Sequence, residues 1–145
     1  MSTPMAEMVT VLLDTNVLEA ALRSRRGASF AVLSLVGTGR FEIAVSVPLV
    51  LEYEEVLLRH ATETARTEAS VRDLLDYLCA VGKRQQIFFR WRPELLDPSD
   101  DMLLELAVAA SCGVIVTHNR RHFRGVDRFG IRVLSPAAFL RELGD

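Results

Sequence analysis

Cysteine is scarce in this sequence, and so are long apolar runs. The two cysteines, Cys79 and Cys112, form neither a CxxC pair nor a zinc-binding spacing with histidine, so we expect no disulfide framework and no zinc site. No apolar run approaches the roughly 18 residues of a membrane span, and residues 1–8 lack the charged-then-apolar layout of a signal peptide. These absences predict a cytoplasmic protein with no membrane segment.

An excess of basic charge is also missing. The 145 residues include 17 Lys and Arg against 19 Asp and Glu, which gives a formal net charge of −2. This balance excludes a strongly basic nucleic-acid clamp but leaves room for a local basic patch. The 5 prolines and 8 glycines are scattered, with no linker or repeat. We therefore predict a single domain over residues 1–145, with residues 1–8 as a flexible N-terminal tail.

Short apolar runs alternate with amphipathic stretches along the chain. Predicted strands cover residues 9–13, 41–47, 86–89, 114–116 and 131–134, and predicted helices cover 17–23, 30–36, 48–60, 63–81, 100–110 and 136–143. This alternation is typical of an α/β domain with a mostly parallel central sheet of about four to five strands flanked by helices. Residues 120–130 are predicted to form a basic loop.

Several acids stand where the hydrophobic pattern directs side chains inward. Asp14 directly follows the first predicted strand, at the strand end where open α/β sheets place their ligand sites. Its alternative role is to cap the next helix. Glu52 shares a helix face with Leu49 and Val56, and its alternative role is that of a rim carboxylate that reaches water. Glu55 is a second candidate on the same helix.

A third inward-facing acid lies at the start of a later helix. Asp100 precedes Leu103 and Ala107 on the apolar stripe of that helix, with Ser99 as the expected N-cap. Its alternative role is a favourable interaction with the helix dipole. Asp101 lies one residue further round the helix and is expected to face solvent.

Polar residues also follow the strand predicted at 114–116. Thr117 and Asn119 point to one side if that strand continues, whereas the alternative for Asn119 is a residue that forms a turn. Carboxylates that converge at a strand-end crevice suit a hard divalent cation, because Mg²⁺ takes oxygen ligands, keeps several waters and often engages phosphate. The pattern therefore indicates a magnesium site.

Four motifs occur in order across nearly the whole chain. They read Asp14-Thr15-Asn16-Val17-Leu18, Ser46-x-x-Leu49-x-x-Glu52-Tyr53, Asp97-Pro98-Ser99-Asp100-Asp101 and Val116-Thr117-His118-Asn119-Arg120-Arg121-His122-Phe123. Together they resemble the PIN-domain family of metal-dependent ribonucleases. The spacing between the third and fourth motifs is most similar to that of the bacterial subgroup of toxins from toxin–antitoxin systems.

The resemblance implies an endoribonuclease that hydrolyses RNA phosphodiester bonds and has an antitoxin as its protein partner. By motif, Asp14, Glu52 and Asp100 correspond to acids that bind Mg²⁺ or Mn²⁺, and Asn119 corresponds to a polar residue of the catalytic site. Further candidates around that site are Thr15, Asn16, Glu55, Asp101, Thr117 and His122. The family, together with the apolar face of residues 71–81, also suggests a homodimer.

The fourth motif departs from the pattern of the toxins at His122, where they have Asp before Phe. A neutral imidazole is a poorer ligand for Mg²⁺ than a carboxylate and suits softer metals. This departure supports a second hypothesis, a catalytically weakened PIN-like domain that acts by binding RNA or protein. Arg120, Arg121 and Arg124 could bind RNA phosphates, and their alternative is a solvated charged surface.

Other α/β enzymes with an Asp after the first strand fit less well. A phosphatase of the haloacid-dehalogenase type requires a second Asp two residues on, where this chain has Asn16. A receiver domain requires an acidic pair before that Asp, and residues 10–13 contain none. The chain has neither a P-loop nor a GxGxxG motif, which argues against nucleotide-cofactor chemistry.

Overall fold

The computed structural model describes residues 8–64, 66–86 and 98–144. Five strands form one sheet: β1 (Thr10–Leu13), β2 (Glu42–Val45), β3 (Lys83–Arg84), β4 (Val114–Val116) and β5 (Arg132–Leu134). Their order is β3-β2-β1-β4-β5, and each neighbouring pair is parallel. The structure thus confirms the α/β class and the parallel sheet, and the five strands within the described residues stand at the upper end of the predicted range.

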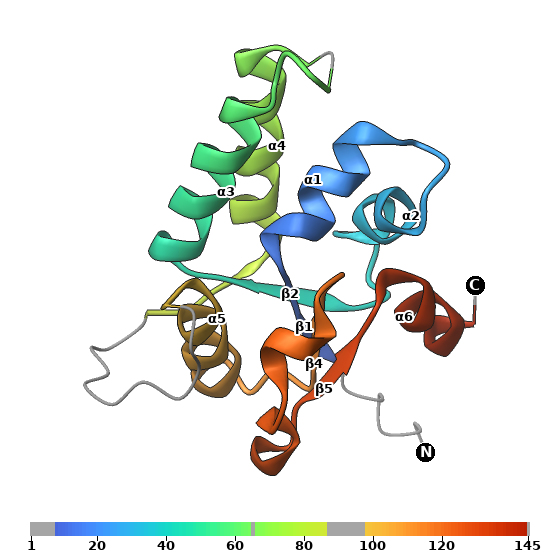
Figure 1. The fold of residues 1–145 in the computed structure, drawn as a ribbon, viewed down its shortest axis with the longest axis vertical. Helices are drawn as coiled ribbons and strands as arrows, with labels where there is room; N and C mark the ends of the chain where they lie inside the picture. Colours follow the sequence, from blue (N-terminus) through green and yellow to red (C-terminus); the bar gives the residue numbers. More distant parts are fainter. Residues whose placement is uncertain (1–7, 65, 87–97, 145) are drawn as a thin grey trace, which may run out of the picture.

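Six helices and two short 3₁₀ helices connect or follow these strands. They are α1 (Thr15–Arg23), α2 (Ala28–Leu35), α3 (Val47–Arg59), α4 (Glu68–Val81), α5 (Pro98–Ala109), η1 (Arg120–Phe123), η2 (Val126–Phe129) and α6 (Pro136–Leu143). Figure 1 shows α1 to α4 on one side of the sheet and α5 on the other. Right-handed crossovers explain this arrangement, because the chain moves from β1 to β2 to β3 in one direction and then returns to β4.

Several element boundaries differ from those predicted. Helix α4 begins later than expected because Thr67 and Ser70 form a reciprocal capping box in front of it. Helix α5 begins at Pro98, so Ser99 lies within the helix and the prediction that it is the N-cap is wrong. The expected basic loop contains η1 and η2.

Some predictions fall on parts of the chain that the structure leaves undescribed. The strand predicted at 86–89 falls mainly on residues 87–89, which lie outside the described residues, and β3 lies just before it. The predicted N-terminal tail, apart from Met8, and Asp97 of the third motif lie outside them as well. In the described ranges, no helix is both long and apolar enough to span a bilayer.

The two central strands position the site. Strands β1 and β4 lie side by side with Leu13 opposite Val116, and their apolar residues are buried because helices or loops cover both faces of the sheet. From β1 the chain continues to β2 on one side of this pair, and from β4 it continues to β5 on the other side, so the direction of the strand order reverses between β1 and β4. A reversal of this kind opens a crevice at the carboxyl ends of the strands, where open α/β sheets bind their ligands.

Candidate functional site

A buried carboxylate lies at the carboxyl end of β1, in the expected crevice. The backbone amide of Asp14 donates to Val116 O at 3.0 Å, which joins the ends of β1 and β4. The side chain of Thr117 is fully buried, and its Oγ1 donates to Asp14 Oδ2 at 2.7 Å. Asp14 itself is only 8% exposed. Its carboxylate is therefore held inside the molecule by a hydroxyl from the neighbouring strand end.

Asp14 does not act as the cap of α1. Asp14 occupies the N-cap position of α1, but its side chain makes no N-cap hydrogen bond to that helix, all of whose residues are described. Instead, Asn16 Nδ2 donates to Asp14 Oδ2 at 3.2 Å, and Asn16 Oδ1 accepts from the amide of His118 at 3.2 Å. Asn16 thus links the start of α1 to the segment after β4, and the helix-cap alternative for Asp14 is wrong.

Burial raises the pKa of Asp14 above its ordinary value. Hydrogen bonds from the Thr117 hydroxyl and the Thr15 amide oppose that rise in pKa, the charge of Glu52 adds to it, and His122 opposes it. Desolvation is the largest of these causes, ahead of repulsion between carboxylates. A desolvated acid with a second carboxylate nearby is typical of functional sites, because a bound cation would offset the cost of its charge.

Glu52 reaches the same region from α3. It is half-buried, and its Oε2 accepts a hydrogen bond from Thr15 Oγ1 at 2.5 Å. The next residue, Tyr53, is buried and donates its hydroxyl to Leu13 O at 2.5 Å, directly before Asp14. Helix α3 therefore supports the end of β1 as well as supplying an acid. Glu55 is exposed and pairs with Arg59 at 2.7 Å, so this second candidate lies away from Asp14.

The first turn of α5 brings in two more acids. Asp100 is 8% exposed and Asp101 is 9% exposed, so both are buried. The expectation that Asp101 faces solvent is wrong, because the surrounding structure covers both acids of the first turn of α5. His122 Nδ1 lies 3.2 Å from Asp100 Oδ2. The imidazole that replaces the expected Asp therefore faces an acid of the third motif.

We call Asp14, Glu52 and Asp100 the acidic site. Glu52 and His122 both act electrostatically on Asp14, and His122 contacts Asp100, which links the three acids through one neighbourhood. Within the described ranges, no three His, Cys, Asp or Glu side chains stand grouped around one metal position. The donors are nonetheless oxygen atoms, and Mg²⁺ binds through one or two carboxylates with several waters. Their chemistry therefore fits a hard divalent cation, while convergence of all three acids on one ion stays a prediction.

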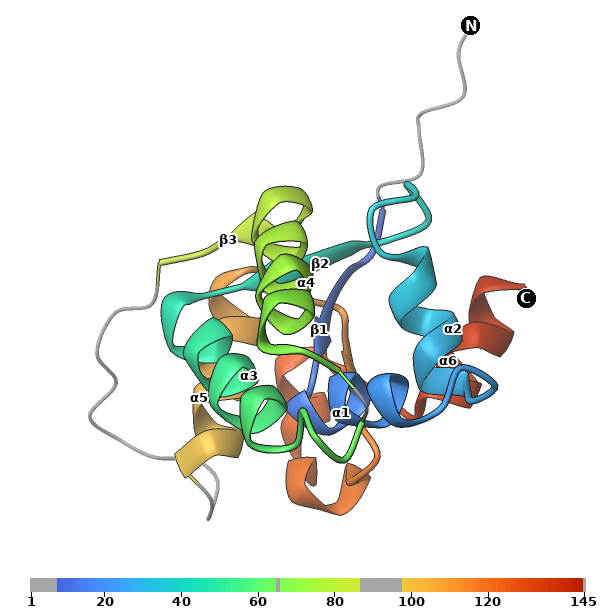
Figure 2. The ribbon, with the colours of Figure 1, turned by 90° about the horizontal axis from the view of Figure 1, so that it is seen from above.

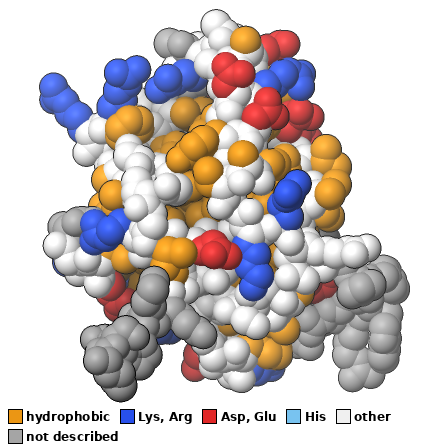
Figure 3. Space-filling view, turned by 180° about the vertical axis from the view of Figure 1, so that it is seen from behind, with side chains coloured by type: hydrophobic (Ala, Val, Ile, Leu, Met, Phe, Trp, Pro, Cys, Tyr) orange, Lys and Arg blue, Asp and Glu red, His pale blue; other side chains and the backbone are white. Residues whose placement is uncertain are grey.

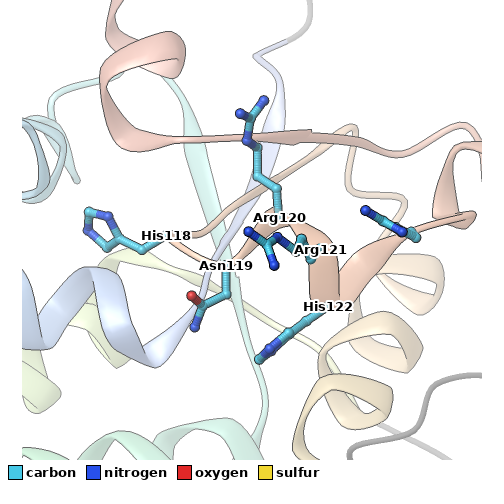
Figure 4. Close-up of a pocket in the computed structure, with 6 residues that line it drawn as sticks. His118, Asn119, Arg120, Arg121 and His122 are labelled. Carbon is cyan, nitrogen blue, oxygen red and sulfur yellow. The ribbon is translucent and has the colours of Figure 1, made fainter.

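A cavity of about 560 Å³ adjoins the acidic site. It is lined by His118, Asn119, Arg120, Arg121, His122 and Arg124, and we call it the cationic pocket. Asn119 and His122 extend toward the same side of their segment in Figure 4. The side chain of Asn119 is exposed, whereas that of Thr117 is buried. The backbone amide of Asn119 donates to Thr117 Oγ1 at 3.0 Å.

Two contacts in this region could not be predicted from the sequence. The side chain of Ser29 is buried, and its Oγ lies 2.7 Å from Nε2 of His118, which had no evident partner. Tyr53 was part of a motif, but nothing in that motif indicated its hydrogen bond to Leu13. In both cases the partner is far away in sequence, so local patterns could not reveal the contact.

Comparisons with known proteins agree with this fold. A family model described as a PIN domain matches residues 10–121. The fold is also similar to that of a chain in the crystal structure of VapBC2 from Rickettsia felis bound to a DNA fragment from their promoter, with a TM-score of 0.58 and 14% sequence identity. The similarity covers 87% of this chain and 98% of that one. No curated protein matches the sequence significantly.

Proposed function

The chain belongs to the PIN-domain family, whose members are generally nucleases that use divalent metals, and from this premise we propose that it is a metal-dependent endoribonuclease. We propose further that it acts in the cytoplasm as the toxin of a toxin–antitoxin pair. The single observation that carries the proposal is the buried Asp14 carboxylate, whose pKa burial raises, at the strand-end crevice beside Glu52.

The acidic site would hold the metal through carboxylate oxygens. Asp14, Glu52 and Asp100 are assigned as its ligands, directly or through bound water. When bound, Mg²⁺ or Mn²⁺ would supply charge to offset that developing on the phosphate and would lower the pKa of a bound water. Both ions accept oxygen ligands, and Mg²⁺ is the proposed cofactor.

Neighbouring side chains would keep these ligands in place. Thr117 donates to Asp14, and Thr15 donates to Glu52, so each acid has one oxygen oriented by a hydroxyl. Such donors fix the direction of the free lone pairs and tune ligand basicity. Asn119 lines the adjacent cavity with an exposed amide, which suits a role in binding the substrate or an attacking water.

The protein partner would be a cognate antitoxin. The similar chain comes from a toxin–antitoxin complex, VapBC2. Figure 3 shows the molecule from behind the view of Figure 1, and hydrophobic side chains gather at the centre of this face. Seen from above in Figure 2, α2 and α4 extend toward this face. A groove of about 210 Å³ on these helices is lined by Leu33 and Leu74 among other residues. An apolar segment of the antitoxin would bury this surface, and the homodimer stays a prediction.

The second candidate is a domain with weakened catalysis that acts by binding RNA or protein. The observation that favours it is the position of His122, which faces Asp100 at 3.2 Å where the toxins supply a carboxylate. An imidazole there adds no hard oxygen ligand, so the metal would bind less tightly than in a site with one more acid.

Cleavage of RNA by the purified protein tests the two candidates. We expect cleavage of mixed single-stranded RNA in Mg²⁺ or Mn²⁺, none in EDTA, and none from Asp100→Asn in either metal. Glu54→Gln is the matched control, since Glu54 pairs with Arg72 on the surface and loses a charge of the same sign. Metal binding by calorimetry without any RNA cleavage would support the weakened domain instead.

A further inference from the structure

The arginines of the cationic pocket are not neutralised. Arg120, Arg121 and Arg124 are exposed, and in the part of the chain that the structure describes none of them forms an ion pair. Arginines elsewhere on the surface, such as Arg23 and Arg59, pair with glutamates. Three guanidinium groups on one cavity create a local positive potential in a chain whose net charge is −2.

Buried contacts fix the wall of this pocket. His118 is held by Ser29, which is 4% exposed and whose Oγ lies 2.7 Å from Nε2 of His118. The amide of His118 donates to Asn16, and the amide of Asn119 donates to Thr117. The segment that carries the arginines is therefore anchored to α1, α2 and the end of β4, so the cavity is a built feature of the fold.

The cationic pocket shares residues with the surroundings of the acidic site. His122 lines the pocket and contacts Asp100, while Asn119 lines it and donates to the hydroxyl that holds Asp14. An anion in the pocket would therefore lie directly beside a phosphate placed at the acids. This adjacency is the geometry that two neighbouring phosphates of one strand require.

We propose that the cationic pocket binds the phosphate next to the one that is cleaved, so that the substrate is RNA with at least two consecutive phosphodiesters. The proposal rests on the proposed nuclease function. A cavity of about 560 Å³ lies within the range of roughly 300–1,000 Å³ that holds small ligands and can take a phosphate with its sugar. Arginine suits this role because its planar fork binds phosphate oxygens in pairs.

Binding without metal tests the pocket separately from catalysis. The affinity of a labelled single-stranded RNA is measured in EDTA by fluorescence anisotropy for the wild type, Arg121→Gln, Arg124→Gln and the double variant. Each lost guanidinium contact should weaken binding roughly tenfold, the scale of a charge-assisted hydrogen bond, and should reduce the salt slope by about 0.7. Arg141→Gln is the control, since Arg141 is exposed on α6 and outside the cavity.

Equal affinities of the double variant and Arg141→Gln would overturn the proposal. Cleavage supplies the second measurement. The wild type should have a higher kcat/KM for a dinucleotide that carries an added terminal phosphate than for the same dinucleotide without that phosphate. That ratio should fall toward one in the double variant and persist in Arg141→Gln. A wild-type ratio of one would overturn the proposal.

The two proposals can fail separately. If the wild type cleaves no RNA, the proposed nuclease function is wrong, while weaker RNA binding by the arginine variants in EDTA would still support the cationic pocket. If the wild type cleaves RNA and the variants bind it as tightly as the control does, the pocket assignment is wrong and the nuclease function stands.

Discussion

The acidic site and the cationic pocket lie side by side but are built in opposite ways. The acids come from the end of β1, from α3 and from α5, and their buried or half-buried carboxylates are held by residues far away in sequence. The arginines come from one run of residues, 120–124, and are exposed. A buried charge is costly unless other elements supply partners, whereas an exposed charge is solvated by water. Substitutions at the acids should therefore have large, coupled effects, and those at the arginines smaller, salt-dependent ones.

The largest effect should come from Asp14→Asn, which removes a buried charge at the centre of the acidic site. We expect RNA cleavage to fall by roughly 10²–10³-fold, the scale of losing one preorganised electrostatic group. The metal-free protein should keep its thermal stability or gain some, because the amide oxygen still accepts from Thr117 and residue 14 no longer carries a buried charge. A large fall in Tm would mean that Asp14 is structural and would break the contrast with the pocket.

The raised pKa of Asp14 fixes the sign of the pH dependence. The folded protein binds this proton more tightly than the unfolded chain, so protonation of Asp14 stabilises the metal-free fold. That contribution is present below the ordinary pKa of Asp and is lost as the pH rises through the raised value. The difference in Tm between the wild type and Asp14→Asn, measured across acidic pH, isolates this contribution. The Tm of the wild type should fall relative to that of the variant as the pH rises, and a relative increase would contradict the assignment.

A smaller effect should follow Thr117→Val, which keeps the shape of the side chain but removes the donor to Asp14. We expect a loss of about 1–3 kcal/mol in the free energy of unfolding, since the buried carboxylate loses one of its donors and the amide of Asn119 loses its acceptor. Cleavage should fall by roughly 10–100-fold. The acid limb of the pH–rate profile should move to higher pH, because the hydroxyl lowers the pKa of Asp14.

The matched control for that variant is Thr38→Val. Thr38 is exposed, and its hydroxyl donates to Leu35 O at the end of α2. It should leave both the pH–rate profile and the cleavage rate unchanged. A shift of the acid limb in the control would show that the effect of Thr117 is not specific to the acidic site.

A moderate effect should come from His122→Asp, where the two regions meet. Because His122 faces Asp100, the new carboxylate would add an oxygen ligand at the acids, so Mg²⁺ should bind roughly tenfold more tightly by calorimetry. Mg²⁺-dependent cleavage should rise with it if metal occupancy limits the rate. His122→Asn, which loses the imidazole without adding charge, should not gain affinity. Unchanged affinity in the Asp variant would mean that residue 122 does not reach the metal.

The smallest effect should come from Glu55→Gln, three residues from Glu52 on α3. Glu55 is exposed and pairs with Arg59, so its loss should change the free energy of unfolding by less than about 0.5 kcal/mol and leave cleavage unaltered. Glu52→Gln should impair cleavage strongly. Equal cleavage by the two variants, measured side by side, would refute the assignment of Glu52 to the acidic site.

The sequence by itself determined the fold class and the elements that carry the acids. Apolar β-branched runs alternating with amphipathic stretches are local signals, and they placed β1, β4 and most helices within a few residues of their observed bounds. The inward direction of Asp14 and of Asp100 was also local information, since it follows from a strand end and from a helix stripe. The four motifs, in their order, gave the family.

Only the tertiary structure decided which side chains meet. Thr117 reaches Asp14 across the β1–β4 pair, Thr15 reaches Glu52 from another helix, and Ser29 of α2 reaches His118 in the segment after β4. Periodicity gives the face of an element on which a residue lies, but not the register or the distance between elements. Asp101 was misjudged for that reason, because its burial depends on what packs around the first turn of α5, which the helix pattern does not reveal.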